Sequence, residues 1–201
     1  MTSTTRTERI SRGSAAVADF EAFVLTGGRS ERMGRDKALL EIDGVPMARR
    51  GTDELERAGA ARVRCVGGDA AELIRLGLDA VDDEHPGAGP LAGLLVALRV
   101  SSLPITLVAP CDLIDPRRDG FADLVAALDG AGRARAAVPL VDGTWRPLPC
   151  ALRSTALASL DDAFAAGERA VHRGLAQLER VEVDAGSFRD ADTPDDLPGH
   201  R

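Results

Sequence analysis

The sequence predicts an α/β fold in which helices cover both faces of a mostly parallel central sheet, giving a three-layer sandwich. Short apolar runs of strand length alternate along the chain with stretches of helical periodicity, which is typical of consecutive βα units. Several of these apolar runs end directly in glycine or aspartate residues. In parallel sheets the loops that follow the strands meet at one edge and bind the ligand there. The fold class therefore also predicts where a functional site lies.

The bulk composition indicates one globular domain, which we expect over residues 20–201. Of the 201 residues, 44% are hydrophobic, enough for a sizeable core. Residues 1–19 are rich in Ser, Thr, Ala and Arg and lack the apolar segment of a secretory signal, so we expect a disordered tail. A formal net charge of -7 argues against a surface for nucleic acid or an anionic membrane. Three scattered cysteines form no zinc or disulfide motif, and no run is long and apolar enough to span a membrane, so we expect a cytoplasmic protein.

The first elements are set by an apolar run and by the turns that follow it. Residues 22–25 predict a strand that leads into a glycine-rich loop. Residues 38–47 form a short extended segment with a turn at Asp43-Gly44. A helix is expected over residues 47–58, ended by Gly59.

The middle of the chain repeats the strand-and-helix pattern. Residues 62–66 alternate polar and apolar side chains and run into two glycines, which predicts a second strand. Residues 70–76 predict a short helix, and residues 78–81 predict a third strand that ends in acidic residues. A loop rich in Pro and Gly then enters a helix that continues through Leu98. The apolar run at residues 105–109 predicts a buried strand.

The remaining elements follow from the same signals. In chain order we expect a helix at 119–128, strands at 136–141 and 149–152 around a turn at Asp142-Gly143, helices at 154–166 and 171–178, and a last strand at 181–183.

The loop at residues 25–37 has the composition of a phosphate-binding loop. Gly27 and Gly28 allow backbone N–H groups to face a ligand, and Arg29, Arg32 and Lys37 add positive charge. The loop is not a P-loop, in which glycine directly precedes lysine, and it lacks the Gly-x-Gly-x-x-Gly spacing of a dinucleotide fold. The alternative reading is a glycine-rich surface turn with solvated charges.

Asp112 is the strongest candidate for a metal ligand. It follows the buried strand at 105–109 directly after Pro110, and a carboxylate there can share Mg²⁺ with phosphate oxygens. The alternative reading is that Asp112 caps the next helix or faces water. The neighbouring Cys111 is expected to be a packed side chain rather than a nucleophile.

The pattern Leu-x-Gly-Gly-x-x-x-Arg-Met-Gly-x-Asp-Lys, from Leu25 to Lys37, resembles the signature loop of the nucleotidyltransferases. Its double glycine resembles the molybdenum cofactor guanylyltransferase family, whereas the related cytidylyltransferases tend to have Ala-Gly. The resemblance implies a Rossmann-like fold of the nucleotide-diphospho-sugar transferase type. It also implies transfer of GMP from GTP to the terminal phosphate of molybdopterin, with Mg²⁺ as cofactor. Cofactor-insertion proteins or apo-molybdoenzymes are the partners that it implies.

The same resemblance implies roles for individual residues. Arg32, Lys37 and Asp112 correspond to catalytic positions, and Asp112 and Asp192 to metal ligands. The implied nucleotide contacts are Leu25, Thr26, Gly27, Gly28, Lys37, Asp83 and Asp112.

Several of these assignments leave alternatives open. Because three acidic residues are consecutive at 82–84, the contact assigned to Asp83 could belong to a neighbour. Asp190 could replace Asp192 on the metal, and Asp192 could instead be a helix N-cap. Where some family members have Asn after the second strand, this chain has Val66 followed by Gly67-Gly68-Asp69, so Gly67 or Asp69 takes that place.

Trp145 and Arg146 lie where the family holds its second substrate, which suggests contacts to a pterin ring and a phosphate. The alternative for Trp145 is a packed side chain. Three other functions stay open: a molybdopterin cytidylyltransferase, a sugar-phosphate or isoprenoid nucleotidyltransferase, and a nucleotide-binding module without turnover.

Overall fold

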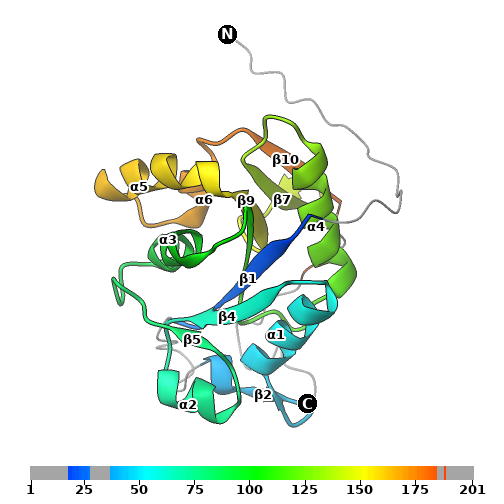
Figure 1. Cartoon of the computed structure of the whole chain (residues 1–201), viewed down its shortest axis with the longest axis vertical. Helices are drawn as coiled ribbons and strands as arrows, with labels where there is room; N and C mark the ends of the chain where they lie inside the picture. Colours follow the sequence, from blue (N-terminus) through cyan, green and yellow to red (C-terminus); the bar gives the residue numbers. More distant parts are fainter. Residues whose placement is uncertain (1–17, 28–36, 185–187, 189–201) are drawn as a thin grey trace.

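An eight-stranded mixed sheet forms the centre of the protein in the computed structural model, which describes residues 18–27, 37–184 and 188. The strand order is β10-β7-β9-β6-β1-β4-β5, and β8 pairs with β7 at the side of this path (Figure 1). The strands are β1 (Phe20–Leu25), β4 (Arg62–Val66), β5 (Ala80–Val81), β6 (Ile105–Pro110), β7 (Ala136–Val141), β8 (Thr144–Trp145), β9 (Cys150–Arg153) and β10 (Arg180–Val183). A separate hairpin pairs β2 (Glu41–Ile42) with β3 (Val45–Pro46).

The sheet is mostly parallel, as the sequence predicted. Strand β1 is parallel to both of its neighbours, β4 and β6, and β4 is parallel to β5. Strand β9 runs antiparallel to β6 and to β7, while β10 is again parallel to β7. The antiparallel strand β9 thus separates the parallel strands β6, β1, β4 and β5 from the other parallel pair, β7 and β10.

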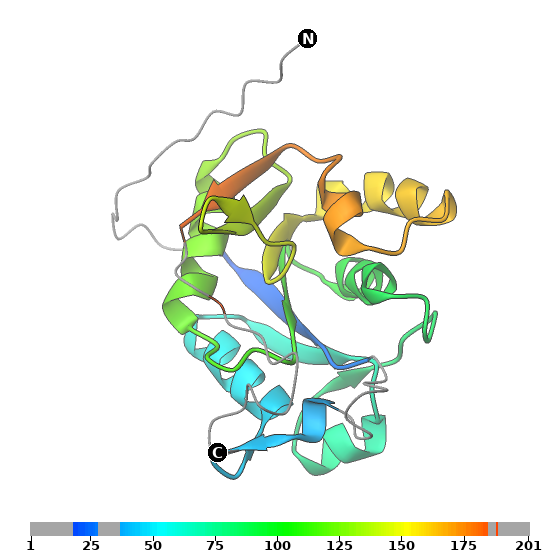
Figure 2. The same cartoon turned by 180° about the vertical axis from the view of Figure 1, so that it is seen from behind.

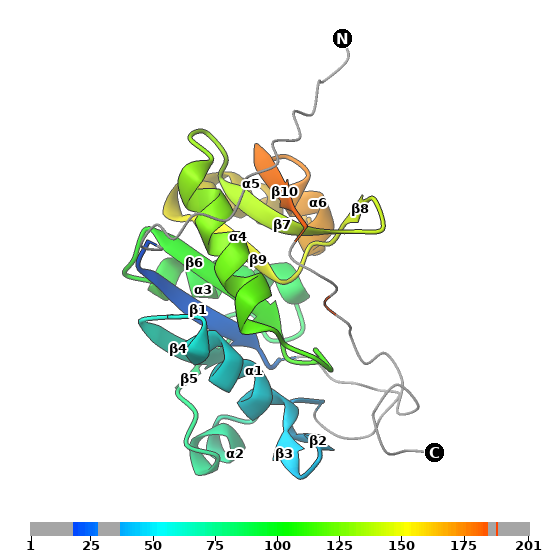
Figure 3. The same ribbon diagram turned by 90° about the vertical axis from the view of Figure 1, so that its right-hand side faces the viewer.

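Helices cover both faces of this sheet. The helices are α1 (Met47–Arg57), α2 (Ala70–Arg75), α3 (Pro90–Val100), α4 (Arg118–Gly130), α5 (Leu157–Ala165) and α6 (Val171–Leu175), with 3-10 turns η1 (Lys37–Leu39) and η2 (Ser154–Ala156). Helices α1 and α4 lie on one face, and α3, α5 and α6 lie on the other (Figure 3). Figure 2 shows the same two helical layers from behind. None of the helices among these residues is long and apolar enough to cross a membrane.

Strand β1 lies between the two layers and is buried on both sides along its whole length. Ala22 and Val24 pack in the core under α1 and α4, whereas Phe23 and Leu25 pack in the core under α3. A strand covered on both faces has a continuous apolar run rather than an alternating one. This explains why β1 and β6 could be recognised in the sequence.

The chain order creates a topological switch point beside β1. From β1 the chain builds β4 and then β5 on one side, and afterwards returns through α3 to place β6 on the other side. Open α/β sheets bind ligands in the crevice beyond the carboxyl ends of the strands at such a point. The fold therefore predicts that a ligand binds at the loops after β1 and β6.

The elements differ from the expectations mainly in the second half. The strands expected at 136–141 and 149–152 are present as β7 and β9, with the turn at Asp142-Gly143 between them, but this turn leads first into the short strand β8, which was not expected. Two prolines between β8 and β9, Pro147 and Pro149, lack the N–H donor that a continuous strand needs. The expected helix at 171–178 ends at Leu175, and the expected strand at 78–81 is limited to Ala80–Val81.

Candidate active site

The carboxyl ends of three parallel strands lie side by side at one edge of the sheet. Leu25, the last residue of β1, is in register with Val66 of β4 and with Pro110 of β6. The residues that follow each of these strands therefore belong to neighbouring loops. The sequence predicted this shared edge from the parallel strand order.

The loops after β1 and β4 are joined by hydrogen bonds. The backbone N–H groups of Thr26 and Gly27 donate to Val66 O at 3.0 and 3.1 Å, and Thr26 Oγ1 donates to Gly67 O at 2.7 Å. The N–H groups of Thr26 and Gly27 are therefore engaged within the protein.

The glycines at this edge are required by a close approach of backbones. A Cβ on Gly67 would lie 3.1 Å from Gly27 Cα and 3.5 Å from Asp83 Cβ, and a Cβ on Gly68 would lie 3.0 Å from Thr26 O. Both Gly67 and Gly68 also have positive φ, at 74° and 79°. The same contacts place Asp83 beside Gly67, in the loop after β4.

Asp69, which the sequence offered beside Gly67 as the replacement for the family's Asn, has a structural role. Its side chain accepts hydrogen bonds from the N–H groups of Ala71 and Glu72 and so caps α2. Of the two residues, Gly67 is the one whose backbone closely approaches the neighbouring loops, at Gly27 and Asp83.

The central finding is an ion pair between Lys37 and Asp112. Lys37 Nζ lies 3.0 Å from Asp112 Oδ2, and the two side chains are 22% and 23% exposed. Lys37 begins η1, and Asp112 follows β6. The two residues that the sequence placed on one edge are therefore in direct contact at the switch point. Lys37 is also the only lysine in the sequence.

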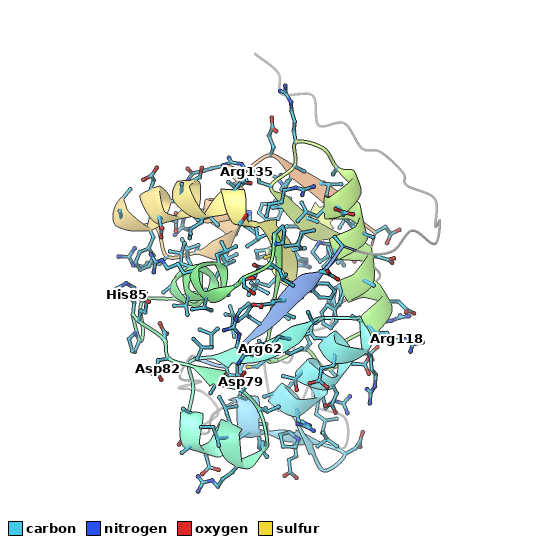
Figure 4. The ribbon with its side chains drawn as sticks, in the orientation of Figure 1. Arg62, Asp79, Asp82, His85, Arg118 and Arg135 are labelled. Atoms are coloured by element: carbon cyan, nitrogen blue, oxygen red, sulfur yellow. The ribbon has the colours of Figure 1, made fainter. Side chains whose placement is uncertain are left out.

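The three acidic residues at 82–84 follow β5, and their side chains differ in exposure and in hydrogen-bond partners. Asp83 is half-buried and its Oδ1 accepts the His85 N–H at 2.9 Å, whereas Asp82 is exposed. Glu84 forms an ion pair with Arg99 at 2.8 Å. Asp82 and His85 lie on the loop between β5 and α3 (Figure 4). Among the three acidic residues, Asp83 is the one that lies against Gly67.

Trp145 lies in the part of the fold built by β7 to β10. Its ring stacks on His172 with 4.5 Å between centroids, and the Arg180 guanidinium lies 4.5 Å from the ring centroid. Arg146 is exposed, and its N–H donates to Pro139 O at 2.8 Å. His172 gave no sequence signal, because its stacking on Trp145 depends on the tertiary fold.

Five of the residues singled out in the sequence, Gly28, Arg29, Arg32, Asp190 and Asp192, lie outside the described residues. Within the described ranges, no group of three or more His, Cys, Asp or Glu side chains could by itself hold a metal ion. Cys111 is buried, as expected for a packed side chain.

A mostly parallel sheet with a lysine–aspartate pair at its switch point defines an α/β domain whose ligand-binding edge lies beyond the ends of β1 and β6. Solved structures share this fold. Molybdopterin-guanine dinucleotide biosynthesis protein A from Archaeoglobus fulgidus superimposes with a TM-score of 0.69 and 23% identity, over 88% of this chain and 94% of that one. The 2-C-methyl-D-erythritol 4-phosphate cytidylyltransferase from Thermus thermophilus superimposes with a TM-score of 0.68 and 22% identity, over 89% and 95%.

Sequence comparison narrows this class to one family. The family described as "MobA-like NTP transferase domain" matches residues 22–181. The chain belongs to this family, and it is a nucleotidyltransferase.

Its relatives carry a more specific name. A molybdenum cofactor guanylyltransferase from Methylibium petroleiphilum is 36% identical over 185 residues, which cover 87% of this chain and 91% of the relative. One from Cupriavidus taiwanensis is 32% identical over 192 residues, covering 90% and 96%.

Proposed function

We propose that this protein transfers GMP from GTP to the terminal phosphate of molybdopterin and releases pyrophosphate. The observation that carries the proposal is the Lys37–Asp112 pair, at 3.0 Å, beside the carboxyl ends of β1 and β6. The relatives that bear the name molybdenum cofactor guanylyltransferase supply the substrate class. We further propose that the product passes to a cofactor-insertion protein or an apo-molybdoenzyme.

The reaction joins two polyanions. An oxygen of the molybdopterin phosphate attacks the α-phosphorus of GTP, a new P–O–P bond forms, and the bond to the β-phosphate breaks to release pyrophosphate. A phosphate monoester has a second pKa of about 6, so the attacking group is largely ionised at neutral pH and needs no general base. The protein must therefore mainly offset charge and align the two phosphates.

In this proposal Lys37 binds the triphosphate. Its ammonium is a compact charge on a flexible stem, suited to follow phosphate oxygens as the leaving group departs. Arg32 contributes a second cation to the same loop, and Leu25, Thr26, Gly27 and Gly28 form the wall against the nucleotide. Asp83, which packs against Gly67, accepts hydrogen bonds from guanine or ribose donors.

Asp112 suits Mg²⁺ on the chemistry of its surroundings. Mg²⁺ usually keeps several water ligands and is held by one or two carboxylates together with substrate phosphates. Asp112 offers one partly exposed carboxylate at the edge where the triphosphate would lie, and Asp192 is proposed as the second ligand. When bound there, Mg²⁺ supplies positive charge that offsets the charge of the phosphate oxygens.

The test is pyrophosphate release measured with GTP, CTP, ATP and UTP, each with and without molybdopterin and with and without Mg²⁺. We expect release only with GTP, Mg²⁺ and molybdopterin together. Preference for CTP would assign the protein to the cytidylyltransferases, and nucleotide binding without release in any combination would make it a binding module.

Two variants test the residues. We expect Lys37→Ala to lower turnover by about 100-fold or more, because it removes a positive charge that offsets the phosphates. We expect a similar loss in Asp112→Ala, because it removes the proposed Mg²⁺ ligand. The matched control is Asp115→Ala, an exposed aspartate of the same loop that should keep near-normal turnover. Unchanged turnover in either variant would remove that residue from the mechanism.

A further inference from the structure

The loop that carries Asp112 is held by helix α1. This loop runs from the end of β6 to Arg117, the residue that precedes α4. One end is fixed by the sheet, because the Cys111 N–H donates to Leu25 O at 3.3 Å. Further contacts come from side chains of α1.

Arg50 makes the most specific of these contacts. Its Nη2 donates to the backbone oxygen of Ile114 at 3.2 Å, two residues after Asp112. The Ile114 side chain is 6% exposed and packs with Ile42 and Met47. Further along, Glu54 Oε2 of the same helix accepts the backbone N–H of Arg118 at 3.2 Å, in the first turn of α4.

The same helix contacts the segment that carries Lys37. The Met47 N–H, at the start of α1, donates to Leu40 O at 2.8 Å, and Leu40 packs against the cluster of Ile42, Met47 and Ile114. One helix therefore sets the position of both partners of the ion pair. Of these polar contacts of α1, the hydrogen bond from Arg50 to Ile114 O is the nearest in sequence to Asp112.

We propose that Arg50 is a positioning residue that holds the Asp112 loop in the geometry needed to bind the metal–nucleotide complex. The inference rests on the proposed role of Asp112 as a metal ligand. A charged donor forms a stronger hydrogen bond to a carbonyl than a neutral one does, and its loss leaves Ile114 O without this donor. The loop then samples positions in which the Asp112 carboxylate is displaced from the triphosphate.

The chain offers a matched control in the preceding residue. Arg49 is also partly buried on α1 and also donates to a backbone oxygen, that of Leu76 at 3.4 Å, and it pairs with Asp53 at 3.1 Å. Its partners lie at the end of α2 and on α1 itself, away from the Asp112 loop. Arg49→Met therefore removes a similar side chain and similar contacts without touching that loop.

The experiment compares Arg50→Met, Arg50→Lys, Arg49→Met and Asp112→Asn. The probe is Mn²⁺ in the presence of GTP, with bound Mn²⁺ measured by electron paramagnetic resonance. Residues that orient a metal ligand typically change metal affinity by about 10-fold to 100-fold when they are replaced. We expect about a 10-fold weaker Mn²⁺ affinity in Arg50→Met, partial recovery in Arg50→Lys, and near-normal affinity in Arg49→Met. Hydrogen exchange of the amides at 111–117 should be faster in Arg50→Met alone.

The outcomes separate this inference from the proposed function. Equal Mn²⁺ affinities and equal exchange in the Arg49 and Arg50 variants, with Asp112→Asn clearly weakened, would overturn the role of Arg50 only. An unchanged affinity in Asp112→Asn would overturn the metal assignment and the inference with it. The thermal midpoint, measured for every variant, shows whether a change in affinity is merely a loss of folded protein.

Discussion

At the scale of single residues, the Lys37–Asp112 pair implies competition inside the site. Each side chain is the other's counterion at 3.0 Å, yet the proposed mechanism assigns Lys37 to phosphate and Asp112 to a metal ion. Binding of nucleotide with its metal therefore exchanges one ion pair for two new contacts. A nucleotide without metal would have to compete with Asp112 for Lys37, and the Asp112 carboxylate would repel its phosphates.

This competition predicts opposite effects of one substitution. We expect Asp112→Asn to bind GTP more tightly than the natural protein in the presence of EDTA, by roughly 3-fold to 10-fold, because the substitution removes the negative charge that repels the phosphates and competes with them for Lys37. With Mg²⁺ the same variant should bind GTP more weakly. Titration calorimetry in both buffers checks the prediction, with Asp115→Asn as control. Weaker binding in both buffers would mean that the pair does not restrain Lys37.

At the scale of elements, a nearly buried ion pair joins β1 to β4, with Glu21 near the amino end of β1. Glu21 Oε2 lies 2.7 Å from Arg64 Nη2, with side-chain exposures of 9% and 11%, and Ser102 Oγ donates to Glu21 Oε1 at 2.8 Å. The Arg64 guanidinium also lies 4.6 Å from the centre of the Phe23 ring. This cluster contains none of the residues assigned to the proposed site, so we expect its role to be stability rather than catalysis.

Glu21→Gln should destabilise the fold without lowering the activity of folded protein. Removing one partner of a buried pair leaves the other charge uncompensated, and we expect a loss of roughly 3–5 kcal/mol in the free energy of unfolding. The control is Asp79→Asn, which removes the exposed pair between Asp79 and Arg62 of the same strand (Figure 4) and should cost about 1 kcal/mol or less. Urea unfolding measures the free energy of unfolding of both variants. Equal losses would contradict the stabilising role assigned to the Glu21–Arg64 pair.

The effect of Glu21 should also depend on pH in a defined direction. Burial raises the pKa of the Glu21 carboxyl, but hydrogen bonds from Ser102 and the charge of Arg64 outweigh burial and hold the pKa below its usual value. The unfolded chain thus binds this proton at a higher pH than the native protein does. The stability from Glu21 is complete above the unfolded-state pKa, about 4.3, and is lost as the pH falls through the lower native pKa. The difference between the natural protein and Glu21→Gln should shrink over that acidic range.

At the scale of the whole molecule, the sequence predicted what depends on local pattern and strand order. Strands β1 and β6 are mostly apolar because both faces are covered, and parallel pairing places the loops with Lys37 and Asp112 at one edge. The two-residue strand β8 has too little sequence for a periodic signal. The contact of Gly67 with Gly27 and the hydrogen bond from Arg50 to Ile114 join distant segments, so no local pattern encodes them.

Because the proposed site is built by loops after β1, β4, β5 and β6, nucleotide binding should stabilise the entire domain. A ligand at 100 times its Kd adds about 2.7 kcal/mol to the free energy of unfolding. For a protein of this size that corresponds to a rise of about 5–11 °C in the thermal midpoint. We expect this rise with GTP and Mg²⁺, and a much smaller one with CTP and Mg²⁺. Scanning calorimetry with both nucleotides, repeated on Lys37→Ala as the control, makes the comparison. Equal rises with GTP and CTP would leave the guanine contact assigned to Asp83 without support, and an equal rise in Lys37→Ala would place the nucleotide away from the ion pair.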